Sequence, residues 1–201
     1  MSGSDFERML TQSLNRYFDS EGIKGIAVRQ KQIKYSEQGF DILVDSRDPL
    51  YYLAIECKSV DGRKTKALYF SQHFNHCGGV CQVERETEYL NRSGRFGLLA
   101  VEVRKGPGKA RRAYLVPWSH VSAQFVYCRK GILGDVITSY PEVPYHQGKY
   151  WFSDSLFGEI GSLCPWTRRY PQLRIGDMDG RSFKDQSGMS ALRAYLRGVD
   201  R

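Results

Sequence analysis

The chain has 201 residues, of which 41% are hydrophobic and 13% aromatic, so it can bury a core and is not expected to be disordered. Its formal charge of +8 favours a polyanionic partner. No apolar run approaches the roughly 20 residues of a membrane span, and the polar N-terminus has no signal-peptide core. Five irregularly spaced cysteines fit a reducing compartment. We therefore expect a cytoplasmic protein with no membrane partner.

The first predicted element is a helix. Four apolar residues recur at helical spacing near the N-terminus: Phe6, Leu10, Leu14 and Tyr17. They predict a helix over about residues 5 to 19, with Gly22 as its stop. A strand should follow from Gly25 to Gln30 and continue through residues 31–34, with cations on one face.

A β-hairpin is predicted next. Two short apolar runs, residues 42–44 and 53–55, flank an Asp48-Pro49 turn. If the turn is centred there, the numbers of paired residues sum to 97 and Asp41 faces Glu56. The Cβ atoms of such a pair lie roughly 5 Å apart on one side of the sheet.

Chemistry concentrates on that side of the hairpin. Period-2 alternation puts Lys58 beside Glu56 and turns Cys57 to the other face. Asp41 and Glu56 repel each other unless a cation lies between them, and Mg²⁺ prefers such oxygen ligands. An ammonium beside a metal-bound water completes a minimal phosphodiester-hydrolysing centre. The alternative is an ordinary surface ion pair, but the strand is apolar on both sides, which predicts a central strand where unpaired charges are costly.

The later elements are predicted from local signals. Residues 61–71 are polar and basic and are expected to form a mobile connection. A helix over about residues 80–91 should end at Ser93-Gly94, followed by strands over residues 96–103 and 113–116. This order predicts an α/β (α+β) fold with a mixed central sheet flanked by helices. We expect a core over residues 1–125 and a C-terminal extension over 126–201 that packs on it and includes a short amphipathic helix near residues 189–196.

Basic residues form the candidate DNA-binding set. Residues 104–112 hold five cations and no acid, which favours phosphate contacts beside a phosphodiesterase centre. A solvated surface is the alternative. For the strand that contains Arg29, a solvated face and a contact to the DNA backbone are equally supported. The complete set is Arg29, Lys31, Lys34, Arg63, Lys64, Lys66, Arg104, Lys105, Lys109, Arg111 and Arg112.

Four motifs occur in order within the first 120 residues. They are Phe6-Glu7-Arg8, Gly25-Ile26-Ala27-Val28-Arg29, Gly39-Phe40-Asp41 followed fifteen residues on by Glu56-Cys57-Lys58, and Gln82-Val83-Glu84-Arg85 leading into Phe96-Gly97-Leu98-Leu99-Ala100-Val101. This series resembles the PD-(D/E)XK nuclease superfamily and, within it, the archaeal-type Holliday junction resolvases. Phe40 stands where the family name leads one to expect proline, and compact resolvases lack an extension of about 75 residues.

The resemblance implies a restriction-endonuclease-like core and a structure-selective, metal-dependent DNA endonuclease. In that family the aspartate and the glutamate of E-x-K bind Mg²⁺, with Mn²⁺ able to substitute; these roles fall on Asp41 and Glu56. Lys58 would orient the attacking water, Glu7 would complete the metal site and Gln82 would support it. The resemblance also implies a homodimer that acts on branched or duplex DNA.

Other interpretations stay open. A restriction- or repair-type nuclease could share the core, and so could a non-catalytic DNA-binding subunit. Glu7 could instead favour the positive end of its helix, worth about 0.3–1 kcal/mol. The aromatic tail, with Tyr150-Trp151-Phe152 and Trp166, offers surface for a dimer.

Two further cofactor possibilities are disfavoured. His73, His76, Cys77 and Cys81 are soft-metal ligand types, but their spacing matches no common zinc site. We expect His73 or His76 to contact DNA or to cap the 61–71 segment. No Gly-rich phosphate loop occurs, so no nucleotide cofactor is indicated.

Overall fold

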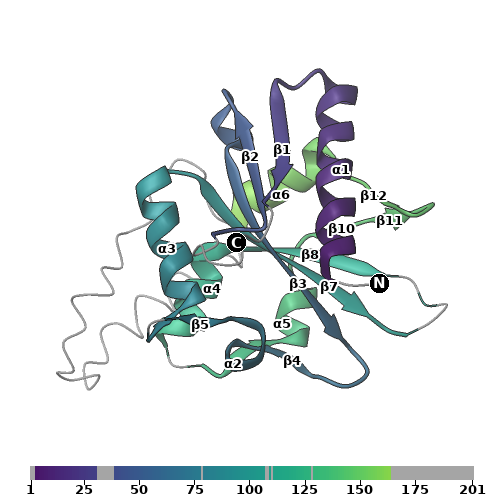
Figure 1. Ribbon diagram of the computed structural model, residues 1–201. Helices are drawn as coiled ribbons and strands as arrows, with labels where there is room; N and C mark the ends of the chain where they lie inside the picture. Colours follow the sequence, from purple (N-terminus) through teal and green to yellow (C-terminus); the bar gives the residue numbers. More distant parts are fainter. Residues whose placement is uncertain are drawn as a thin grey trace. The chain divides into compact units, whose positions relative to one another are not determined.

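A six-stranded mixed sheet lies at the centre of the fold, with helices on both faces (Figure 1). The computed structural model describes residues 3–30, 39–77, 79–106, 109, 111–127 and 129–163, all within the compact unit Met1–Tyr170. The helices of this part are α1 (Gly3–Glu21), α2 (Phe70–His73), α3 (Gln82–Ser93), α4 (Trp118–Val126), α5 (Gly134–Thr138) and α6 (Asp154–Leu163), with a short 3₁₀ turn η1 (Pro49–Tyr51).

Strand β3 occupies the interior of the sheet, whose order is β1-β2-β3-β7-β8-β10. The strands are β1 (Gly25–Arg29), β2 (Ile42–Ser46), β3 (Leu53–Asp61), β7 (Phe96–Arg104), β8 (Arg112–Pro117) and β10 (Glu142–Val143). β3 and β7 run parallel and the other neighbours antiparallel, which confirms the predicted mixed sheet. Three two-stranded pairs complete the described part: β4 (Ala67–Tyr69) with β9 (Gly131–Leu133), β5 (His76–Cys77) with β6 (Val80–Cys81), and β11 (Tyr145–His146) with β12 (Lys149–Tyr150).

Each face of the sheet buries its own apolar cluster. One cluster contains the stripe of α1, the inward side chains of α6, and Ile55 and Cys57 of β3. The other contains Ala54 and Val60 of β3 with residues of α3 and α4. The alternation along β3 follows from the pleat, and it places Glu56 and Lys58 on the α3 side.

The predicted hairpin register is confirmed. Ile42 pairs with Ile55, Leu43 with Ala54 and Val44 with Leu53, so each pair sums to 97. The turn carries η1, which is capped because Asp48 Oδ1 accepts a hydrogen bond from Leu50 N at 2.9 Å. This register brings Asp41, immediately before β2, to the level of Glu56 and Cys57.

Helix α1 fixes the outer edge of the sheet. The helix ends where Gly22 adopts a positive φ of 66°, as the sequence predicted. Asn15 donates from Nδ2 to Ala27 O at 2.9 Å and accepts from Ala27 N at 2.8 Å. These bonds satisfy the backbone N–H and C=O of Ala27 on the free edge of β1, which limits pairing of β1 with another strand. The predicted continuation through residues 31–34 lies outside the described residues.

The prediction of a mobile connection over residues 61–71 is wrong. β3 extends to Asp61, and β4 and the first turn of α2 follow, with Ala67, Leu68 and Phe70 buried. β4 is stabilised by β9, which lies more than 60 residues later in the chain. Such a non-local pairing leaves no local signal in the sequence.

Residues after 126 contribute to both sides of the sheet as far as Leu163. β10 extends the sheet beside β8, and Tyr17 OH bonds to Asp154 at the start of α6. The division at residue 125 stays a prediction, and the helix expected near residues 189–196 lies outside the described part. Within that part, no helix is long and apolar enough to cross a membrane.

Candidate functional site

Asp41 is held by the backbone of the neighbouring strand. Cys57 N donates to Asp41 Oδ2 at 2.8 Å, and Gln30 N donates to Asp41 O at 2.7 Å. Cys57 itself is a buried free thiol on the opposite face of β3. These two backbone hydrogen bonds therefore hold Asp41 at the level of Glu56.

Glu56 lies at the centre of a buried polar cluster. Its side chain is 2% exposed, and its Oε1 accepts from Lys58 Nζ at 2.5 Å and from Gln82 Nε2 at 2.8 Å. Its Oε2 has no hydrogen-bond partner among the described residues. Lys58 Nζ also lies 4.9 Å from the ring centroid of Phe74, so the ammonium rests against an aromatic face.

Glu86 belongs to this cluster, although sequence reasoning missed it. It is 1% exposed and lies one helical turn after Gln82, whose Nε2 donates to Glu86 Oε1 at 2.7 Å. Its Oε2 also lacks a partner among the described residues. The signal was present, because Glu86 follows Val83 by three residues and precedes Leu90 by four, on the buried stripe of α3.

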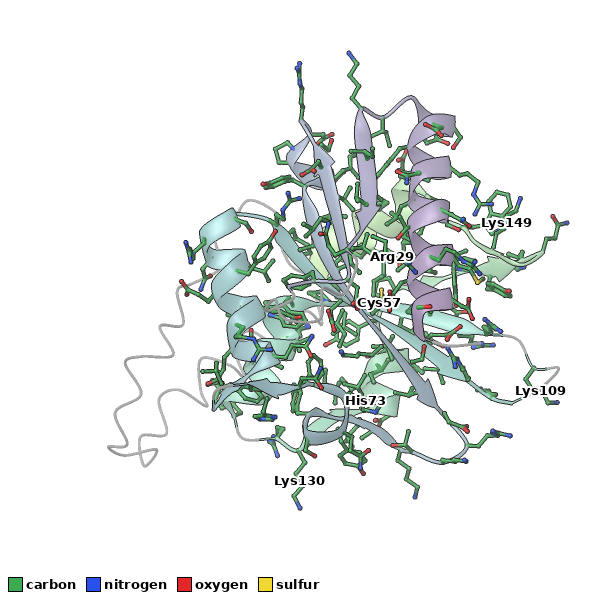
Figure 2. All side chains as sticks on the ribbon, viewed as in Figure 1. Arg29, Cys57, His73, Lys109, Lys130 and Lys149 are labelled. Atoms are coloured by element: carbon green, nitrogen blue, oxygen red, sulfur yellow. The ribbon has the colours of Figure 1, made fainter. Side chains whose placement is uncertain are left out.

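Glu7 and Arg29 lie at the margin of the cluster. Arg29 Nη1 donates to Ser4 O at 3.1 Å, beside the first turn of α1 (Figure 2). Burial raises the pKa of Glu7, and Arg29 opposes that shift. Glu56 and Lys58 also act on Glu7 through their charges, so α1 and the hairpin share one electrostatic environment.

Burial dominates the protonation of this cluster. It raises the pKa of Asp41 from the ordinary 3.8 to about 8, with the charge of Glu56 as the second cause. Burial likewise raises the pKa of Glu86 well above its ordinary value, again followed by Glu56. Burial acts to lower the pKa of Lys58, but the charge and hydrogen bond of Glu56 outweigh it, so the pKa is raised and Lys58 stays an ammonium.

These shifts predict a pH-dependent stability. The folded protein retains protons that the unfolded chain loses, so the free energy of unfolding should fall as pH rises between 3.8 and about 8. Urea unfolding in EDTA at several pH values measures the slope. Asp41→Asn should flatten it, whereas Asp19→Asn on the exposed surface of α1 should not. An unchanged slope in Asp41→Asn would contradict a protonated, desolvated Asp41.

Two arginines of the basic run at residues 104–112 are paired with a buried acid. Arg104 Nε and Arg111 Nη1 donate to Glu102, which is fully buried, at 2.6 and 3.4 Å. Ser59 Oγ and Tyr150 OH also donate to Glu102, at 2.8 and 3.1 Å. Glu102 lies just before the run of residues 104–112, so two of its five cations pair with an acid outside the run, and the DNA-binding role of the run stays a prediction.

The other candidate DNA contacts vary in exposure. Arg63 is paired with Asp61 at 2.8 Å, and Arg112 lies 3.7 Å from Glu142. The exposed lysines are Lys64, Lys66, Lys105 and Lys109, and Lys109 lies at the periphery of the view in Figure 2. Lys31 and Lys34 lie outside the described residues. Sequence reasoning missed two exposed cations, Arg129 and Lys130, next to α2, where Phe70 N donates to Lys130 O at 3.0 Å.

His73 and Cys81 belong to the set of soft-metal ligand types found in the sequence. Cys81 is the N-cap of α3, where its backbone N donates to Glu84 Oε2 at 2.7 Å. Burial lowers the pKa of His73, and the positive charge of Lys58 is the second cause. The side chain of Cys77 lies outside the described part. Among described residues, no three or more His, Cys, Asp or Glu side chains are grouped to hold a metal ion.

Comparisons with known proteins assign no function to the chain. No protein-family model matches the sequence, and no curated protein matches it. Among solved structures, one that it is similar to is Hjc, a Holliday junction resolvase from Archaeoglobus fulgidus. That similarity has 16% identity and a TM-score of 0.34, and covers 76% of this chain and 98% of the other.

Proposed function

We propose that the chain is a metal-dependent DNA endonuclease that hydrolyses phosphodiester bonds and selects branched DNA, as a Holliday junction resolvase does. One observation carries the proposal: the Asp41 carboxylate is packed beside Glu56 and Lys58 of an interior strand. Burial there raises the pKa of Asp41 to about 8, and Glu56 Oε2 has no partner among the described residues. Buried, mutually repelling carboxylates are costly and mark functional sites more often than structural ones.

The donor set fits Mg²⁺, with Mn²⁺ as a substitute. Asp41 and Glu56 would hold the cation, and Glu7 would complete the site from α1. Mg²⁺ commonly takes one or two protein carboxylates and keeps several waters, which suits Asp41 and Glu56 as its two main ligands. When bound, the cation would neutralise the scissile phosphate and lower the pKa of a water.

The chain's own groups would do the rest. The Lys58 ammonium, held by Glu56 and by the Phe74 ring, would orient the attacking water and offset negative charge at the phosphate. Gln82 would keep Glu56 in place through its 2.8 Å hydrogen bond. Cys57 N would hold the Asp41 carboxylate in place through its hydrogen bond to Oδ2.

Exposed lysines would bind the flanking DNA backbone. Replacing Lys105 and Lys109 with glutamine should weaken binding equally on every DNA sequence, because phosphate contacts carry no sequence information. The log–log salt dependence should flatten by about one unit for each phosphate that a lysine no longer neutralises. Fluorescence anisotropy at several salt concentrations measures this slope. Lys24→Gln, exposed at the opposite end of β1 from Arg29, is the control. An unchanged slope would mean that the two lysines are only solvated.

Two strand cuts call for two sites, so we further propose a C₂ homodimer. Light scattering at micromolar concentration should give about twice the chain mass of 23.1 kDa. The expected interface needs revision, because Tyr150 and Phe152 are buried in the α1-side cluster and only Trp151 of that motif is exposed, at 53%. Trp166 lies outside the described residues. A monomer that persists on DNA would favour a nicking enzyme.

A cutting assay on labelled four-way, forked and linear DNA tests the function. We expect cleavage with Mg²⁺ or Mn²⁺, none with EDTA, and the fastest rate on the four-way junction. A preference for linear duplex would favour a restriction- or repair-type nuclease. Tight DNA binding without cleavage in any cation would contradict the proposal and favour a non-catalytic subunit.

A further inference from the structure

Gln82 bridges two buried carboxylates with one nitrogen. Its Nε2 donates to Glu56 Oε1 at 2.8 Å and to Glu86 Oε1 at 2.7 Å, so both amide hydrogens are used inside the protein. Its Oε1 accepts from Asn75 N at 3.2 Å. That acceptor role fixes the amide with its nitrogen toward the acids, since the reversed amide would set its oxygen against Glu56 Oε1 and its nitrogen against the donor Asn75 N.

The bridge is built on a well-anchored helix. Residues four apart on a helix are neighbours, which puts Glu86 directly beyond Gln82 on the buried side of α3. Gln82 N also donates to Asn75 O at 2.8 Å, and the capping box of Cys81 and Glu84 holds the first turn. Gln82 and Glu86 are 8% and 1% exposed, so water does not readily replace either partner.

The two oxygens of Glu56 therefore differ. Oε1 accepts from both Lys58 Nζ and Gln82 Nε2, whereas Oε2 has no partner among the described residues. The Glu56 oxygen that the two donors do not occupy is left to bind a cation. The orientation of the Gln82 amide helps to decide which oxygen that is, and Glu86 accepts the second hydrogen of the amide.

We propose that Glu86 is a positioning residue for the cation site: it holds the Gln82 amide so that Glu56 Oε1 is occupied and Glu56 Oε2 faces the cation. This inference rests on the proposed function, because it takes Glu56 as a cation ligand. Glu86 itself contacts neither DNA nor the scissile phosphate. Its acceptor oxygen matters, and its negative charge does not.

Calorimetric titration of Mn²⁺ into the DNA-free, full-length protein tests the proposal. Glu86→Leu removes the acceptor and should weaken Mn²⁺ binding about 10- to 100-fold, the usual loss for groups that orient a metal ligand. Glu86→Gln keeps an acceptor oxygen and should bind like wild type. Glu88→Leu, exposed on the same helix, is the matched control. Gln82→Leu breaks the same bridge from its middle and should repeat the loss if Glu86→Leu does not fold.

Cleavage rates separate positioning from chemistry. Saturating Mn²⁺ should restore the rate of Glu86→Leu, because its defect is in binding. Wild-type Mn²⁺ affinity in a folded Glu86→Leu would overturn the proposal, as would wild-type affinity in Gln82→Leu or an equal loss in Glu86→Gln. Glu56→Gln separates a failure of the positioning role from a failure of the proposed function. If this variant binds Mn²⁺ with unchanged affinity, Glu56 is not a cation ligand and the proposed function fails as well.

Discussion

Asp41→Asn and Glu56→Gln should each lower the single-turnover cleavage rate by at least about 1,000-fold, equivalent to about 4 kcal/mol of transition-state stabilisation. DNA affinity should stay within about threefold of wild type, because removing a negative charge does not weaken the hold on a polyanion. The hairpin register, continued by one residue, sets the partly buried Asp41 opposite the buried Glu56. Rates from labelled junction DNA and affinities from anisotropy in Ca²⁺ measure the two effects separately.

Asp45→Asn is the matched control for these variants. It makes the same change four residues later, but Asp45 is exposed near the far end of β2 and is paired with Arg95 at 2.6 Å. Its cleavage rate should stay near wild type. Turnover retained in Asp41→Asn or Glu56→Gln would remove the proposed centre, and loss of DNA binding in both would indicate a folding defect instead.

Lys58→Met should lower the cleavage rate by about 100-fold or more, because it removes the ammonium that orients the water and offsets negative charge. Unlike the acid variants, it should still bind Mn²⁺, since both carboxylates remain. It should also be less stable by about 3 kcal/mol, because a buried Glu56 loses its partner. Lys24→Met, exposed just before β1, is the control and should change neither quantity.

A double variant separates the two roles of Lys58. Lys58→Met combined with Glu56→Gln removes both charges, so urea unfolding should recover most of the lost stability. Cleavage should not recover. If Lys58→Met alone cut DNA at a rate near wild type, the water-positioning role would be wrong, whatever its stability.

The sequence predicted those parts of the fold that depend on neighbours along the chain. The hairpin register followed from one turn and two apolar runs, and it brought Asp41 to Glu56. The end of α3 followed from Gly94, which adopts a φ of 70°. The interior position of β3 followed from its apolar character on both sides. In each case the signal lies within one short stretch of the chain.

Two buried acids were missed. Glu86 and Glu102 resemble solvated charges when read singly, and only their bonds in the fold explain their burial: Gln82 donates to Glu86 from one helical turn away, and Tyr150, distant in sequence, donates to Glu102. Both lie on the buried periodicity of their elements, so a test for acids on apolar stripes would have found them. Residues 61–71 and β10 depend on β9 and β8, and such long-range pairings leave no local pattern.

Anomalous scattering from Mn²⁺ in crystals of the wild-type protein would locate the cation. We expect a peak at the cluster, bound by oxygens of Asp41 and Glu56, with Oε2 as the Glu56 ligand and Lys58 beside it. Crystals of Asp41→Asn should lack the peak. A strong peak elsewhere, or none at the cluster at a Mn²⁺ concentration that supports cleavage, would contradict the proposed metal-dependent centre.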